Sequence, residues 1–190
     1  MYRLRIIFFL ICFHSGNFLS AQWFVGVKFM GVTFHTDKNQ NAGLYKVAFG
    51  KNKRVSLNFG VALTAEYYFY QHTVSVKYDQ ALFRDCAGKF AGSSLLTIRY
   101  TLDMQRLGEG SVGMGPFFFY RKNWNALPGY IDDGYFRSSS NGKWQRKFVW
   151  YGGEFEYDHR IKNDLDFSLN LFPGYPVVYA LTPGVRMRVR

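Results

Sequence analysis

Residues 54–70 read RVSLNFGVALTAEYYFY, and every second side chain of this stretch is apolar. Successive side chains of a β-strand point to opposite faces, so a strand here has one apolar face and one polar or small face. The apolar face consists of Val55, Leu57, Phe59, Val61, Leu63, Ala65, Tyr67 and Phe69. The other face consists of Ser56, Asn58, Gly60, Ala62, Thr64, Glu66, Tyr68 and Tyr70. The alternation predicts one long strand whose two faces meet different surroundings.

The same two-residue period recurs along the chain after residue 22 and predicts eight strands. Their expected ranges are 23–35, 54–70, 72–82, 90–102, 111–121, 146–158, 164–172 and 177–190. Short links follow the second, fourth and sixth strands, and long links follow the first and fifth. Tight turns on one side and longer loops on the other are typical of an up-and-down membrane barrel. We therefore predict an all-β fold, an eight-stranded antiparallel up-and-down transmembrane β-barrel, formed by one domain over residues 22–190.

The first 21 residues differ from the rest of the chain. Arg3 and Arg5 precede the apolar run Ile6–Phe13, and small residues end the segment at Ala21. This is the pattern of a secretory signal peptide, and its apolar run is too short to span a bilayer. Removal of the segment lowers the formal net charge from +11 to +9 and leaves Cys86 as the only cysteine, so no internal disulfide can form. An exported protein of this kind is not expected to bind nucleic acid.

The periodicity alone does not decide which face points inward. In a soluble sandwich or lipocalin-like barrel the apolar face points inward, whereas in a membrane barrel it faces lipid. Several predicted strands have at least the roughly 9–11 residues that a tilted strand needs to cross a bilayer. Aromatic residues also gather at strand ends, at Trp23, Tyr67–Tyr70 and Phe117–Tyr120, as in interfacial girdles. We favour the membrane barrel; a soluble secreted lipocalin-like binding protein is an alternative.

The polar faces carry charges of both signs. The bases are Lys28, Lys77, Arg99, Arg186 and Arg188, and the acids are Glu66, Asp79, Glu154, Glu156, Asp158 and Asp166. An eight-stranded barrel has an interior just wide enough for side chains to fill. We therefore expect an interior closed by ion pairs, without an open pore.

The pattern over residues 22–190 resembles the small eight-stranded outer-membrane barrels of Gram-negative bacteria, of the OmpX and OmpA N-terminal type. The Ala21–Gln22 junction and the stretch from Trp150 to Pro176 resemble barrel proteins of the Bacteroidota. One departure is the C-terminus, because such barrels usually end in an aromatic residue and this chain ends at Arg190. The resemblance implies a monomer in the outer membrane, in contact with membrane lipid and lipopolysaccharide.

Some small barrels of this kind modify lipid A, so an acyl hydrolase or acyltransferase using His35 is the alternative function. A general base needs a partner within hydrogen-bond reach. The first candidates for that partner are Asp85 and Cys86; Ser93, Asp132 and Ser138–Ser140 are further ones. No metal-ligand spacing or cofactor motif occurs, so we expect neither group. Our preferred hypothesis is that the protein is a non-enzymatic barrel.

The predicted outer loops are basic and aromatic. Their bases, which we expect to contact lipopolysaccharide phosphates or an external partner, are Lys38, Lys46, Lys51, Lys53, Arg54, Arg121, Lys122, Arg137, Lys143, Arg146 and Lys147. The third of these loops also contains Trp124, Tyr130, Tyr135, Phe136 and Trp144. So many aromatic residues in one loop suggest a folded cap or a recognition surface.

Overall fold

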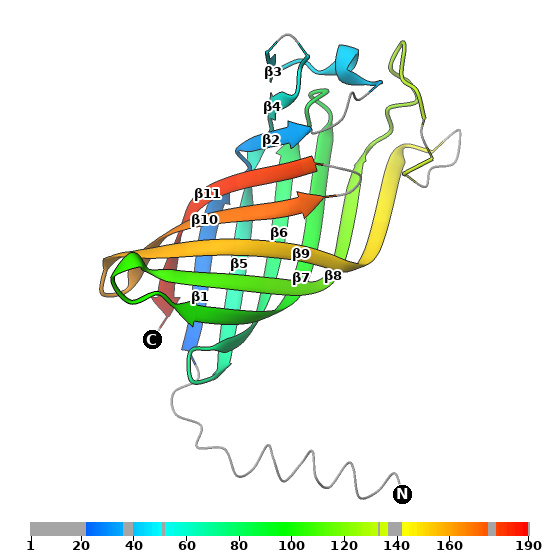
Figure 1. The fold of residues 1–190 in the computed structure, drawn as a ribbon. Coiled ribbons are helices and arrows are strands. Elements are labelled where there is room, and N and C mark those ends of the chain that lie inside the picture. Colours follow the sequence, from blue (N-terminus) through cyan, green and yellow to red (C-terminus); the bar gives the residue numbers. More distant parts are fainter. Residues whose placement is uncertain are drawn as a thin grey trace, which may run out of the picture.

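The protein forms a closed antiparallel β-barrel (Figure 1). The structure, a computed structural model, describes residues 22–35, 40–50, 52–132, 134–136, 142–174 and 178–189. Each wall strand pairs with its neighbours in the order β1-β5-β6-β7-β8-β9-β10-β11, and pairing of β11 with β1 closes the wall. The described residues thus confirm the predicted eight-stranded up-and-down fold.

The wall strands are β1 (Gln22–Phe29), β5 (Phe59–Tyr70), β6 (Val74–Arg84), β7 (Phe90–Asp103), β8 (Glu109–Lys122), β9 (Trp144–Lys162), β10 (Leu165–Gly174) and β11 (Val178–Val189). Three short strands, β2 (Val32–His35), β3 (Ala48–Phe49) and β4 (Val55–Leu57), extend the sheet at one end of the barrel. Two single-turn 3₁₀ helices are η1 (Ala42–Leu44) and η2 (Gln105–Leu107). The described residues include no helix long and apolar enough to cross a membrane.

The two ends of the barrel differ in the length of their connections. The turn end carries residues 71–73, 104–108 and 163–164, and the loop end carries the segment around β2–β4, residues 85–89 and the long link between β8 and β9. This separation of short turns from longer loops follows the prediction. Every predicted wall strand is present within a few residues of its expected bounds.

The first two predicted strands are each interrupted once, which the periodicity did not indicate. The range 23–35 breaks at Met30–Gly31, and 54–70 breaks at Asn58. Gly31 has a φ of +48°, and a Cβ at that position would lie 2.2 Å from the Leu181 carbonyl oxygen. Only glycine fits such a close backbone approach without strain. The breaks allow β2 to pair with both β11 and β4 beyond the barrel wall.

Strand β5 shows which face of the barrel is apolar. Leu63 on its apolar list is 60% exposed, whereas Glu66 on its other list is 2% exposed. The same alternation holds on β6 and β7, where Lys77 and Arg99 are fully buried and Ile98 is exposed. The apolar side chains therefore face outward and the charged ones inward, which is opposite to the arrangement of a lipocalin-like barrel.

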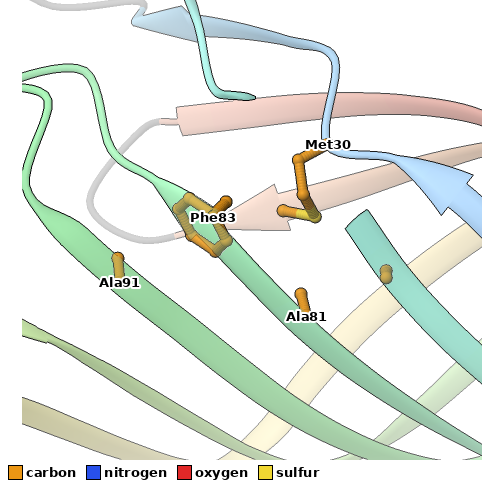
Figure 2. Packing of buried hydrophobic residues seen from close by; sticks show 5 residues of the cluster. Met30, Ala81, Phe83 and Ala91 are labelled. Carbon is orange, nitrogen blue, oxygen red and sulfur yellow. The ribbon is translucent and has the colours of Figure 1, made fainter. Parts of the chain in front are cut away.

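The interior has two zones along the barrel axis. From the turn end to the middle, the inward side chains are polar or charged, as at Ser75, Lys77 and Asp79 on β6. Towards the loop end the same strand turns Ala81 and Phe83 inward, and these pack with Met30, Ala62 and Ala91 in an apolar cluster. Figure 2 shows the Met30 side chain pointing towards Ala81 and Phe83. This change from charged to apolar filling positions the candidate site.

Candidate functional site

The candidate site is a cavity inside the loop-end half of the barrel, with a volume of about 240 Å³. Its walls are mainly apolar and come from strands on all sides; they include Met30, Ala62, Ala81, Phe83, Leu95, Phe117, Phe119, Phe172 and Ala180. Space remains here because the inward positions of β5, β6 and β11 carry alanine where the other zone carries long charged side chains. The loop-end opening, which we call the mouth, is lined by His35, Tyr45, Asp85, Arg121 and Trp124.

The floor of the cavity is the upper edge of a buried ion-pair cluster. Lys77 lies at its centre, with Nζ 2.7 Å from Glu154, 2.5 Å from Glu156 and 3.1 Å from Asp79. Lys28 also pairs with Glu156. Asp79 lines the cavity, so a carboxylate marks the boundary between the two zones. A charge removed from water needs such partners, because an isolated buried ion is very costly.

Two arginines continue the cluster towards the turn end. The Arg99 guanidinium lies 3.0 Å from Glu66 and 3.5 Å from Glu156. The Arg186 guanidinium lies 3.0 Å from both Asp158 and Asp166, and 3.3 Å from Glu66. Most of these contacts join strands that are not hydrogen-bonded neighbours in the wall, such as β7 with β5 and β9, so they tie the strand register together.

Arg121 does not occupy the exposed loop position that the sequence analysis gave it. Its side chain is only 8% exposed, because it lies at the mouth between aromatic rings. The guanidinium carbon is 3.8 Å from the centre of the Trp124 ring and 3.9 Å from that of Phe136. Nε donates to Gln145 at 2.7 Å and Nη2 donates to the Tyr130 hydroxyl at 3.2 Å. Arg121 is therefore buried under an aromatic cap and is not on an exposed surface as the sequence analysis expected, while its role in binding stays a prediction.

Asp85 holds the mouth together. Its carboxylate accepts hydrogen bonds from the backbone N–H groups of Ala87 (3.1 Å) and Lys89 (2.8 Å), and from Trp124 Nε1 (2.8 Å). Burial raises the pKa of Asp85 above its usual range, against the opposing effect of these hydrogen bonds. The residue therefore joins the short β6–β7 loop to the aromatic cap, which is a structural task.

Cys86 lines the cavity beside Asp85. Burial, with a further contribution from the Asp85 carboxylate, raises the pKa of the Cys86 thiol to about 12. The thiolate is the nucleophilic form of cysteine, so the thiol is a poor nucleophile at neutral pH.

His35 has hydrogen-bond partners other than the two that the sequence analysis named first. Its Nε2 is 3.2 Å from Ser56 Oγ, and its Nδ1 is 3.4 Å from the Tyr45 hydroxyl. Sequence reasoning did not single out Ser56, because this contact depends on the pairing of β2 with β4. The arrangement places a hydroxyl within reach of an imidazole at the mouth of an apolar cavity.

The remaining predicted binding residues lie around the mouth. Lys46, Arg54, Lys122, Lys143 and Arg146 are exposed, and Lys53 and Lys147 are half-buried. Two of them lie over aromatic rings: Lys122 Nζ is 4.1 Å from the Trp144 ring centre, and Lys147 Nζ is 4.3 Å from that of Tyr135. Lys38, Lys51 and Arg137, and the further partner candidates Ser138–Ser140, lie outside the described residues. Within the described ranges, no three His, Cys, Asp or Glu side chains gather in a way that could hold a metal ion.

The chain is similar in fold to proteins of known structure. No protein-family model matches the chain, and no curated protein matches its sequence. Among solved structures, the chain is similar to Ail, the attachment invasion locus protein of Yersinia pestis, crystallised in complex with the heparin analogue sucrose octasulfate. The alignment covers 90% of this chain and all of Ail at 10% identity, with a TM-score of 0.48.

Lys77 gives a direct test of the ion-pair cluster. We expect Lys77→Met to lower the free energy of unfolding by about 3–5 kcal/mol, because Asp79, Glu154 and Glu156 lose a shared counter-ion in a buried site. The measurement is urea unfolding of the purified protein in lipid vesicles. Arg160→Met is the matched control, because Arg160 is 52% exposed in its ion pairs and should contribute no more than about 1 kcal/mol. Equal effects of the two substitutions would contradict the assignment.

Proposed function

We propose that this protein is an outer-membrane β-barrel of a Gram-negative bacterium, exported by the signal peptide of residues 1–21. The observation that best supports this location is the distribution of side chains, which is opposite to that of a soluble protein. Charged side chains are fully buried, and large apolar side chains are exposed around the wall. The exposed set includes Val25, Val27, Phe29, Val61, Leu63, Leu96, Ile98, Val112, Met114 and Phe155. Soluble monomers rarely expose such a continuous apolar area, whereas a bilayer covers it.

The role we propose for the barrel is non-enzymatic, and the protein is a monomer with a closed interior. The observation that supports a closed interior is the ion-pair cluster, whose buried side chains lie between the cavity and the turn end. Water and ions could pass only by separating Lys77, Arg99 and Arg186 from their carboxylates. A barrel of eight strands leaves little room for a pathway around them.

The loop end is the side we propose to face outward, in contact with the phosphates of lipopolysaccharide or an external partner. Exposed bases surround the mouth, and the described exposed residues near them include few acids. Lys122 lies against Trp144, which adds an apolar surface beside the charge. Basic side chains at an anionic membrane surface contribute about 1 kcal/mol each.

The membrane location has a specific mutational test. Leu63→Arg should destabilise the barrel in phosphatidylcholine vesicles by about 2–4 kcal/mol, because a charge enters the lipid-facing wall at mid-height. Leu107→Arg is the control; Leu107 is 69% exposed in the η2 turn and should change stability by no more than about 1 kcal/mol.

The wild-type protein should also fractionate with outer membranes and show heat-modifiable gel mobility. Recovery in the soluble fraction without a mobility shift would overturn the proposal.

The loop charges have a separate test. Neutralising Lys122, Lys143 and Arg146 to Gln should remove about 3 kcal/mol of interaction with lipopolysaccharide, which is roughly a hundredfold in affinity. Binding is measured on protein in vesicles, and the difference should shrink at high salt. The matched control neutralises Arg106, Arg160 and Lys162 at the turn end. If both triple variants bind equally, the loop end is not the contact surface.

A second candidate function, a lipid A-modifying acyl hydrolase or acyltransferase, is favoured by the contact between His35 and Ser56. In this function Ser56 Oγ attacks an ester carbonyl while His35 Nε2 takes the hydroxyl proton and returns it to the departing alcohol; water or an acceptor hydroxyl then releases the acyl group. Labelling by a fluorophosphonate should then be lost in Ser56→Ala and strongly reduced in His35→Gln, but kept in Ser93→Ala. Unlabelled wild-type protein, with lipid A unchanged in cells that express it, would exclude the activity.

A further inference from the structure

We propose that the loop-end cavity holds the chain of a single-chain anionic amphiphile, with the carboxylate or phosphate of that molecule at Arg121. This assigns a ligand class to the site and rests on the proposed function only in placing the loop end outward.

The walls fit an apolar chain. Ala62, Ala81 and Ala180 leave space beside larger apolar residues such as Phe83, Leu95 and Phe117. Polar side chains, among them Thr33, Asn58 and Ser93, also line the cavity, but most of its wall is apolar and suits an apolar ligand. The interior of an eight-stranded barrel is narrow and long. A single extended chain matches that shape better than a branched or globular molecule.

The floor sets the direction in which the chain enters. Asp79 lines the cavity at its closed end and belongs to a buried cluster with more acids than bases. The bases of this cluster are Lys28, Lys77, Arg99 and Arg186, and its buried acids are Glu66, Asp79, Glu154, Glu156, Asp158 and Asp166. An anionic headgroup at this depth would lie beside more carboxyl groups than bases, in a region of low dielectric. The terminal methyl group therefore points to the floor and the headgroup stays at the mouth.

The depth of the cavity limits the chain length. Asp79 at the floor lies on β6, and Asp85 at the mouth follows the last residue of β6, six positions further along the chain. That spacing corresponds to roughly 20 Å along the strand. Strand tilt makes the depth along the barrel axis somewhat smaller. A medium-length chain fills this depth, and a longer one must leave its head above Arg121.

Arg121 supplies the anion-binding group at the mouth. Gln145 and Tyr130 hold two of its nitrogens, and Trp124 and Phe136 hold the guanidinium plane. The hydrogen bonds to Gln145 and Tyr130 use Nε and Nη2, and the nearby Asp85 carboxylate already accepts three hydrogen bonds. A guanidinium fixed in this way is a suitable donor, through Nη1, to a carboxylate or phosphate oxygen. The exposed bases around the mouth would attract the same charge.

Trp124 offers a local readout, because it lines the cavity in the cap. The test protein carries Trp23, Trp144 and Trp150 as Phe, so that Trp124 is the only fluorophore, and is reconstituted in phosphatidylcholine vesicles. The probes are brominated dodecanoic acid, the lysophosphatidic acid with the same brominated chain, and the brominated alkylamine and alcohol of equal length. We expect saturable quenching of Trp124 by both anionic probes, at least tenfold tighter than by the amine. The tighter of the two anionic probes identifies the source of the headgroup.

Two sets of variants, in the cavity wall and at Arg121, separate the site of the apolar chain from the site of the headgroup. Ala81→Phe fills the cavity and should weaken both anionic probes at least tenfold, whereas Ala65→Phe, on the outward list of β5, should not. Ala62→Phe is the second filling variant in case the first does not fold, as judged by heat-modifiable mobility. Arg121→Gln should remove the preference for the acid over the alcohol, and Arg121→Lys should keep part of it.

The proposal is overturned by unsaturable quenching, by equal quenching in the filled and unfilled proteins, or by an amine that binds as tightly as the acid. Because the protein is purified and reconstituted, these results do not depend on where the cell places it. A failure here is therefore distinguishable from a failure of the membrane location, which fractionation reports.

Discussion

The buried ammonium of Lys77 is the interaction on which the interior depends. It is shared by Asp79 on its own strand and by Glu154 and Glu156 on β9. The last two are 77 and 79 residues away in the sequence, so the contacts form only when the wall is closed in one register. A slip of one residue would turn every charged side chain towards the outer surface and every apolar one inward. The ion pairs and the strand register therefore specify each other.

The location of the charges also explains why a cavity exists. Long charged side chains fill the barrel from the turn end to its middle, and their partners must lie at the same height. Above Asp79 the inward positions carry alanine and a few larger apolar residues, which do not fill the cross-section. The aromatic cap then covers this space from the loop end, with Arg121 between Trp124 and Phe136. The inward side chains change from charged to mainly apolar along the strands. This change gives the cavity a polar floor and apolar walls, and Arg121 makes its mouth cationic.

The fold was largely predictable because a strand has a simple period. Alternation in residues 54–70 and in seven further segments predicted the wall strands, and the lengths of the links predicted their up-and-down order. The breaks at Met30–Gly31 and Asn58 could not be predicted, since both depend on how closely β11 and β4 approach that part of the chain.

The site was less predictable than the fold. His35, Asp85 and Cys86 were singled out and all three line the cavity, yet the hydrogen-bond partners of His35 and Asp85 differ from those expected. His35 meets Ser56 and Tyr45, while Asp85 meets Trp124, across pairings that have no short-range signal. Arg121 looked like one more basic loop residue, because its burial depends on aromatic rings that fold over it.

The sequence by itself determined that the chain forms long strands with one apolar and one polar face, because side-chain direction is fixed locally by the β-backbone. Only the tertiary structure decided which side chains share the interior at the same height. That outcome depends on the closure of β1 on β11 and on the stagger of the strands, which place Lys77 beside Glu154 and leave Ala62 opposite open space. For the residues 54–70, the apolar list faces outward and Glu66 lies inside, 3.0 Å from Arg99.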